Sequence, residues 1–314
     1  MTSLRKLGSS DLEVFPLALG GNVFGWTADE AQSFAVLDAY VAAGGNFVDS
    51  ADMYSSWIPG NKGGESETVL GKWLAARGNR SDVVVATKVG GHPEYPGLSA
   101  GNIKAAAEAS LSRLGTDYID LYYTHFDDPS VPVEEIITAL DELVKAGKVR
   151  AIAASNVSPE RLQESLDFSD REGLARYVAL QPHYNLVSRD TYEGALEEVA
   201  SRGGLAAVPY YALESGFLTG KYRPGAQVDS VRAEGAFKHL ESERGQRVLK
   251  ALDEVAQEHG AEVATVALAW LASRPTVAAP IASARVVEQL PALVAVADLQ
   301  LTDADLTKLT EASA

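Results

Sequence analysis

The chain has 314 residues, a formal net charge of −16 and no cysteine. The lack of cysteine excludes disulfide frameworks, thiolate nucleophiles and cysteine metal sites. The negative charge argues against nucleic acid and anionic membrane surfaces as partners, and is otherwise explained by solubility. The first residues show no signal peptide, and no apolar stretch reaches the length of a membrane span, so we expect a cytoplasmic protein.

The first predicted element is a β-hairpin, with arms at residues 4–7 and 12–21 and a turn at 8–11. After it, short β-rich segments alternate with amphipathic helical segments. The eight β-rich segments are residues 15–20, 46–49, 83–88, 118–125, 149–155, 177–181, 205–210 and 276–283.

Helices are predicted between the strands from 3.6-residue periodicity, over residues 29–44, 99–115, 132–148 and 158–168. Ser99 and the Ser158–Pro159 pair are predicted caps, and Pro132 is predicted to lie in a first turn. The stretch from Ala212 to about Leu240 is predicted as a long loop after the seventh strand. A loop of that length usually has a function.

The alternation of strands and helices indicates parallel strands joined by crossover helices. Eight such units favour a closed (β/α)8 barrel, with an open doubly wound sheet as the structural alternative. No linker or change in composition marks a domain boundary. We therefore predict an α/β protein with one domain over residues 1–314, a TIM barrel with an N-terminal β-hairpin and extra helices near the C-terminus.

Ionisable side chains stand where the predicted strands end, which is where barrels of this type place their active sites. Asp49, Lys88 and His125 end the second, third and fourth strands, and Tyr54 follows Asp49 by five residues. Each residue alone also has a purely structural explanation. Asp49 could cap a turn, and Lys88 could be a solvated strand end. His125 could be a structural histidine with its hydrogen bonds satisfied, and Tyr54 a packed loop aromatic. Together at successive strand ends they indicate an active site.

These side chains suit the reduction of a carbonyl group. A phenol has a free pKa of about 10 and needs help to act as an acid at neutral pH, which a nearby ammonium gives by favouring the phenolate. A carboxylate holds the ammonium, and an imidazole orients the carbonyl or shares the proton. No nucleophile is visible, so the attacking species, with hydride the obvious candidate, has to come from a cofactor. A metal-dependent hydrolase would need clusters of histidine and carboxylate at strand ends, but His125 is the only histidine placed there, so no metal site is predicted.

Seven segments, in order, resemble those of the aldo-keto reductase family. They are "GGNFVDSADMYSS", "VVVATKVG", "LGTDYIDLYYTHFDDP", "AIAASNVSPERL", "LQPHYNL", "VPYYALESGFLTGKY" and "VAAPIASARVVEQL". The likeness extends from the N-terminal hairpin to the C-terminal helix. It implies an NADPH-dependent reductase of aldehydes and ketones that binds its dinucleotide without a Rossmann fingerprint.

The resemblance assigns catalytic roles by position. Tyr54 would be the general acid that protonates the new alkoxide. Lys88, paired with Asp49, would lower the pKa of that phenol. His125 would orient the carbonyl and assist the proton step.

The resemblance also implies a cofactor site. Its residues would be Ser155, Asn156 and Gln181 on the carboxamide, Tyr210 rather than Tyr211 stacked on the nicotinamide, and Ser283, Arg285 and Gln289 near the 2′-phosphate and adenine. Two features depart from the family: Pro291 and Ala292 replace a common Glu-Asn pair, and Arg285 is the only cation of its segment. We expect NADPH to be preferred over NADH through Arg285.

The expected partner is a small-molecule carbonyl substrate, bound by a monomer or a small homo-oligomer. Loop aromatics Trp26, Tyr54, Trp57, His92 and Tyr95 would suit an apolar or aromatic aldehyde or ketone, unless Trp57 and Tyr95 only cover the barrel end. An alternative function is a cofactor-sensing regulatory subunit resembling potassium-channel β-subunits, which would form a tetramer with a membrane channel.

Overall fold

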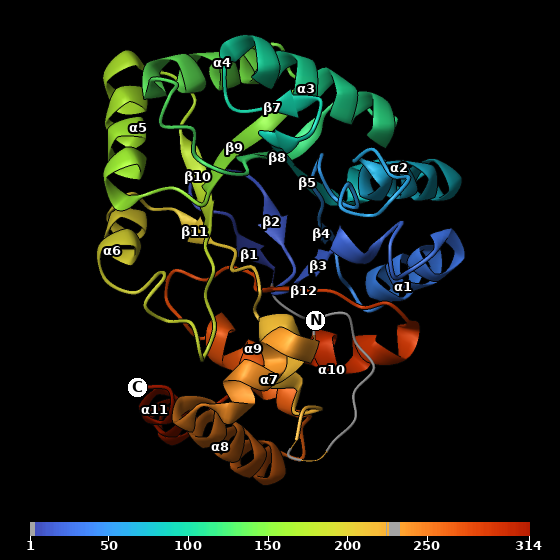
Figure 1. The fold of residues 1–314 in the computed structure, drawn as a ribbon. Helices are drawn as coiled ribbons and strands as arrows, with labels where there is room; N and C mark the ends of the chain where they lie inside the picture. Colours follow the sequence, from blue (N-terminus) through green and yellow to red (C-terminus); the bar gives the residue numbers. More distant parts are fainter. Residues whose placement is uncertain (1–3, 224, 226–232) are drawn as a thin grey trace.

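A parallel β-barrel forms the centre of the structure, a computed structural model that describes residues 4–223, 225 and 233–314 (Figure 1). Its strands run in the order β12, β3, β4, β5, β8, β9, β10 and β11. Their bounds are β3 Ala18–Gly20, β4 Phe47–Asp49, β5 Val84–Val89, β8 Ile119–Thr124, β9 Val149–Ser155, β10 Tyr177–Gln181, β11 Ala206–Ala207 and β12 Ile281–Ala282. All neighbouring pairs are parallel.

Backbone hydrogen bonds close this sheet between β11 and the segment that leads into β12. The N–H of Ala207 donates to the carbonyl of Thr276 at 2.7 Å, and the N–H of Ala278 donates to the carbonyl of Ala207 at 2.9 Å. A third bond joins the N–H of Ile281 to the carbonyl of Pro209 at 2.9 Å. The predicted (β/α)8 barrel is thereby confirmed, and the open doubly wound alternative is wrong.

Helices connect consecutive strands and surround the barrel (Figure 1). The connecting helices are α1 Glu30–Ala42, α2 Glu65–Arg77, α3 Ala100–Leu114, α4 Val133–Lys145, α5 Pro159–Glu172, α6 Ala195–Arg202 and α9 Val263–Ala272. The extra helices are α7 Ala233–Glu241, α8 Glu243–His259, α10 Leu290–Val294 and α11 Asp303–Ala312. Two small hairpins pair β1 Arg5–Lys6 with β2 Glu13–Val14, and β6 Gly91–His92 with β7 Tyr95–Pro96.

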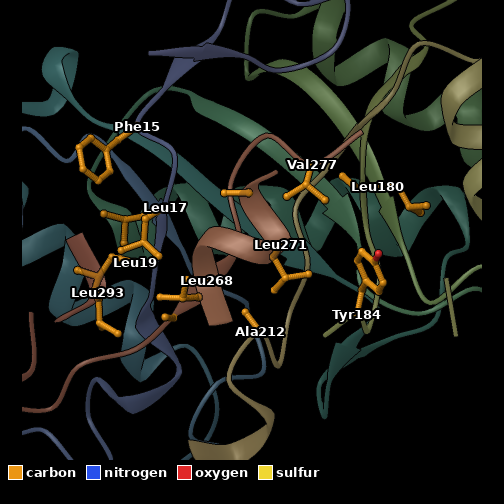
Figure 2. Close-up of a cluster of buried hydrophobic side chains, with 14 of the residues drawn as sticks. Phe15, Leu17, Leu19, Leu180, Tyr184, Ala212, Leu268, Leu271, Val277 and Leu293 are labelled. Carbon is orange, nitrogen blue, oxygen red and sulfur yellow. The ribbon is translucent and has the colours of Figure 1, made fainter. Parts of the chain in front are cut away.

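Alternation along the strands divides the core into two layers, because successive side chains of a strand point to opposite faces. On β8, Leu121 and Tyr123 join the cluster inside the barrel, whereas Tyr122 joins the cluster between strands and helices. Figure 2 shows part of this outer layer, which includes Leu268 and Leu271 of α9 together with Leu19 of β3 and Leu180 of β10. The same alternation sends Lys88 and its neighbour Thr87 to opposite faces of β5.

Of three local predictions at helix starts, two require correction and one is confirmed. Ser99 occupies the N-cap position of α3 but makes no side-chain capping bond, and the free N–H of Ala100 instead donates to Glu135 Oε1 at 2.8 Å. Pro132 is the N-cap of α4 and so precedes its first turn. Ser158 does cap α5, by accepting from the N–H of Arg161.

The predicted loop from Ala212 to Leu240 is not irregular throughout. It contains a 3-10 segment, η3 Glu214–Thr219, and the helix α7, while residues 224 and 226–232 lie outside the described part. Aromatic contacts explain this order: the rings of Tyr222 and Phe237 meet edge-on at 5.5 Å, and Phe217 contacts His239 at 5.4 Å.

Gly71 gives a direct test of the packing between α2 and α3. A Cβ at this position would lie 2.5 Å from the carbonyl oxygen of Arg113 and 2.7 Å from that of Leu114. We expect Gly71→Ala to lower the free energy of unfolding by about 1–3 kcal/mol, because backbone has to move. Urea denaturation would measure the change.

The matched control is Gly101→Ala, in the first turns of α3. A Cβ there would meet nothing within 4 Å, so alanine is expected to stabilise the protein, by about 0.5–1 kcal/mol. Equal effects of the two substitutions would contradict the described packing.

Candidate active site

A buried ion pair stands at the C-terminal ends of β4 and β5. The Lys88 ammonium lies 2.8 Å from Asp49 Oδ1, 2.7 Å from Asp49 Oδ2 and 2.6 Å from the backbone carbonyl of Ser50. Lys88 is fully buried, and this burial lowers its pKa, although the carboxylate of Asp49 opposes the change. Three acceptors thus hold the amine in one place.

Tyr54 lies on the loop that follows β4, with its hydroxyl at this ion pair. Lys88 Nζ donates to the Tyr54 hydroxyl oxygen at 3.1 Å, and that hydroxyl donates to Asp49 Oδ2 at 3.3 Å. The loop turns sharply at Ser55, whose φ is +72° and whose hydroxyl donates to the carbonyl of Phe24. An ammonium hydrogen bonded to a phenol oxygen favours the phenolate.

His125 follows β8 and lies beside Tyr54, with ring centroids 6.1 Å apart. Burial, and after it the charge of Lys88, holds the pKa of His125 well below its ordinary value. Its Nδ1 is buried without a hydrogen-bond partner among the described residues, next to Gly91, where a Cβ would lie 3.4 Å away. The imidazole is therefore neutral at neutral pH, able to form a hydrogen bond but carrying no charge.

Polar side chains at the ends of β9 and β10 join this group. Gln181 Nε2 donates to Asp49 Oδ1 at 2.9 Å, and the Ser155 hydroxyl donates to the backbone carbonyl of Gln181 at 2.9 Å. Asn156 Nδ2 donates to the backbone carbonyl of His125 at 2.8 Å, and Tyr210 donates from its hydroxyl to Asn156 Oδ1 at 2.9 Å. The structure therefore links four sequence-predicted cofactor residues to the four catalytic candidates.

The three remaining candidates lie after β12. The backbone N–H of Arg285 donates to Gln289 Oε1 at 2.8 Å, which brings these two residues together. The Ser283 hydroxyl donates to Asn22 Oδ1 at 2.7 Å. Arg285 is exposed and has no ion pair within the described residues, so its guanidinium is available to an anion.

The predicted loop aromatics form two contacting groups, one of which includes the Tyr54 ring. Trp57 meets Tyr54 edge-on at 6.2 Å and Trp26 at 5.5 Å, and 45% of Trp57 is exposed. His92 and Tyr95 contact each other on the β6–β7 hairpin.

Phe126 was missed by the sequence reasoning. It stacks on His125 with centroids 4.5 Å apart and planes 8° apart, and it is 45% exposed. Its position directly after His125 is the feature of the sequence that could have identified it as part of the site.

Glu214 was also missed, although it organises the segment after β11. Its Oε2 accepts from Asn185 Nδ2 at 2.6 Å and from Ser188 Oγ at 3.2 Å, and lies 3.0 Å from His183 Nε2. Burial would raise the pKa of Glu214, but hydrogen bonds from His183, His239 and Asn185 outweigh it and hold the pKa well below its ordinary range. His183 in turn stacks on Tyr210 at 5.4 Å.

Within the described residues, no group of three or more histidine and carboxylate side chains could hold a metal ion. Among the helices in that part of the chain, none is both long and apolar enough to cross a membrane.

Comparisons with known proteins match almost the whole chain to one protein family. The sequence model of the Aldo/keto reductase family matches residues 16–314. "Protein tas" of Escherichia coli is 32% identical, over 97% of this chain and 96% of its own length. A "Probable voltage-gated potassium channel subunit beta" of Oryza sativa is 34% identical, over 92% of this chain and 90% of its own. "Aryl-alcohol dehydrogenase [NADP(+)]" of Phanerodontia chrysosporium is 30% identical, over 96% and 83%.

Proposed function

Because the chain belongs to the aldo/keto reductase family, we propose that it is an NADPH-dependent oxidoreductase that reduces aldehydes or ketones to alcohols. The observation that carries the proposal is the Tyr54 hydroxyl, held 3.1 Å from the Lys88 ammonium, which itself contacts both oxygens of Asp49. We further propose that residues 1–314 form one domain and act in the cytoplasm on small molecules.

The protein's part in the reaction is to move one proton and to hold the carbonyl. Tyr54 donates the proton of its hydroxyl to the carbonyl oxygen as negative charge develops there. Lys88 stabilises the phenolate that remains, and Asp49 fixes the position of the amine. His125, neutral because it is buried beside Lys88, orients the carbonyl oxygen by a hydrogen bond rather than by charge.

The polar groups at the later strand ends fit a nicotinamide dinucleotide. When bound, this cofactor supplies the hydride. A carboxamide needs donors and acceptors in one plane, and Ser155, Asn156 and Gln181 provide hydroxyl and amide groups at adjacent strand ends. Tyr210, braced by His183, provides a ring for stacking.

The phosphate end of the cofactor is proposed to lie at Ser283, Arg285 and Gln289. An exposed guanidinium without an ion pair in the described part of the chain suits a 2′-phosphate, which accepts charge-assisted hydrogen bonds. This is the basis for proposing NADPH rather than NADH.

Arg285→Ala is expected to weaken NADPH binding by about 10- to 100-fold, because one hydrogen bond to a charged group contributes about 1.5–3 kcal/mol. The affinity for NADH should change less than threefold, since NADH lacks the 2′-phosphate that Arg285 is proposed to bind. Dissociation constants from cofactor fluorescence would measure both. Arg202→Ala, which removes an exposed arginine of α6, is the matched control, and an equal loss for both cofactors would contradict the role of Arg285.

The proposed activity is tested directly with a panel of aldehydes and ketones and the loss of NADPH absorbance. The exposed rings of Trp57 and Phe126 near Tyr54 and His125 support a preference for aromatic or apolar carbonyl compounds over small polar ones. Turnover should persist in the presence of chelator. No turnover of any carbonyl compound, by a protein that binds NADPH, would overturn the proposal.

A second candidate function is a cofactor-sensing regulatory subunit. The observation that favours it is the 34% identity to the protein named as a probable potassium channel subunit beta. Size-exclusion chromatography separates the two proposals in part, because the regulatory function predicts a stable tetramer. A tetramer without carbonyl reduction would favour this candidate over the enzyme.

A further inference from the structure

A second group of ionisable side chains is buried behind the Lys88–Asp49 pair, on the side of β5 that faces α2 and α3. Thr87 of β5 donates from its hydroxyl to Glu67 Oε1 at 2.5 Å. Arg113 of α3 donates from Nε to Glu67 Oε2 at 2.6 Å. The charge of Glu67 is therefore balanced by Arg113, and both of its oxygens are satisfied.

Asp52, on the loop between β4 and Tyr54, has no such partner. It is fully buried, and neither of its carboxyl oxygens has a hydrogen-bond partner of ordinary geometry within the described residues. Its backbone N–H donates to the carbonyl of Lys88 at 3.3 Å, so the residue is fixed directly beside β5. A buried carboxylate without hydrogen bonds is strongly unfavourable, whereas a protonated carboxyl group is much less so.

Burial and the neighbouring carboxylate of Glu67 also favour the protonated form. Burial first, and then the charge of Glu67, raise the pKa of Asp52 to about 8, against the opposing charges of Arg113 and Lys88 and the nearby backbone N–H of Met53. The pKa of Tyr122, on β8, is raised well above its ordinary value by burial and then by Asp52 and Glu67, so that phenol stays neutral.

His92, on β6, is the remaining titratable group of this region. Burial and the charge of Arg113 lower its pKa, so it stays neutral at and above neutral pH. Asp52 also affects Lys88, because the negative charge of its carboxylate acts to raise the pKa of the Lys88 amine. Asp52, with a pKa raised to about 8, is therefore expected to change its charge in the pH range where enzymes of this kind are assayed.

We propose that Asp52 is a protonated carboxylic acid in the resting protein, and that its ionisation sets the alkaline limit of the Lys88–Tyr54 proton donor. When Asp52 releases its proton to solvent, a second negative charge joins that of Asp49 near the Lys88 ammonium. The ammonium then stabilises the Tyr54 phenolate less, so Tyr54 gives up its proton less readily. The first half of this proposal is independent of the proposed function, and the second half rests on it.

Protein stability tests the first half without any substrate. The carboxyl group of an unfolded aspartate has a pKa of about 3.9, whereas that of folded Asp52 has a pKa of about 8. Between pH 4 and pH 8 the folded state therefore binds more protons than the unfolded state. Stability due to Asp52 is thus fully present below pH 4 and is lost as the pH rises towards 8. Asp52→Asn, which is neutral and has the same shape, removes this dependence.

The Tm of Asp52→Asn minus that of the native protein is expected to increase steadily from pH 5 to pH 8. Asp117→Asn, which neutralises an exposed aspartate before β8, is the control and should show no such trend. In addition, the infrared band of a protonated carboxyl should persist in the native protein at pH 7 and disappear with a midpoint near pH 8. Parallel Tm profiles, or no such band at pH 7, would overturn the proposal, and the band decides the matter even if the variant fails to fold.

The pH dependence of kcat/KM for carbonyl reduction tests the second half. The native profile should fall with an ionisation near pH 8, and in Asp52→Asn that fall should move upward by about one pH unit or more. Identical alkaline limbs in the two proteins would overturn the coupling to Lys88. Since the Tm and infrared results need no turnover, failure of the carbonyl reductase proposal is distinguishable from failure of the Asp52 proposal.

Discussion

Replacing Tyr54 by phenylalanine is expected to lower kcat/KM for carbonyl reduction by about 100- to 10,000-fold, the usual contribution of a positioned general acid. The substitution removes one oxygen, which lies 3.1 Å from Lys88 Nζ, and leaves the ring to pack against His125 and Trp57. NADPH affinity should therefore remain within about twofold of native, because no proposed binding contact is lost. Steady-state kinetics and cofactor fluorescence measure the two quantities separately.

Tyr118→Phe provides the control for this experiment. Tyr118 lies just before β8, where its ring contacts the guanidinium of Arg80 at 4.0 Å, away from the strand ends that form the site. This variant should keep native turnover. If Tyr54→Phe were equally active, the proton-donor role of Tyr54 would be wrong and His125 or water would have to supply the proton.

Lys88→Met is expected to impair stability and activity together. It leaves the buried carboxylate of Asp49 without its cation, which costs about 3–5 kcal/mol of the free energy of unfolding. It also removes the charge that stabilises the Tyr54 phenolate, so turnover should fall at least as far as in Tyr54→Phe. Urea denaturation and steady-state kinetics measure the two effects.

A double variant separates the loss of the ion pair from the loss of packing. Asp49→Asn/Lys88→Met removes both charges, so it should recover part of the stability lost in Lys88→Met while remaining inactive. Lys221→Met, at an exposed lysine, controls for the substitution itself. A double variant as unstable as Lys88→Met would show that the cost does not come from an unpaired carboxylate.

The barrel could be predicted because its signals are local. Each β-rich segment carries its own apolar pattern, and the side chain that ends it, such as Asp49 or Lys88, is adjacent in sequence. Helix ends were less predictable, since Ser99 and Ser158 look alike in sequence but only Ser158 makes the capping bond. At Ala100 the donor is satisfied by Glu135, which belongs to another helix.

Residues of the site that act across strands were harder to predict. The likeness to a known family gave Gln181 a cofactor role, but not its hydrogen bond to Asp49, 132 positions earlier. Glu214 gathers partners from residues 183 to 188 and from α7, and nothing in its own segment signals this. From its sequence, Asp52 looks like an ordinary loop aspartate. It lacks a partner in the structure because the nearby Arg113 is hydrogen bonded to Glu67 instead, and the sequence gives no sign of this.

Transfer of deuterium to an aromatic aldehyde from NADPH that carries deuterium at both C4 hydrogens of the nicotinamide tests the central claim most directly. Mass spectrometry of the alcohol should find one deuterium on the carbinol carbon, formed equally in the presence of chelator and almost undetectable with Tyr54→Phe. Alcohol without deuterium, or no alcohol from any aldehyde or ketone despite bound cofactor, would contradict the account of this site as a hydride-dependent carbonyl reductase.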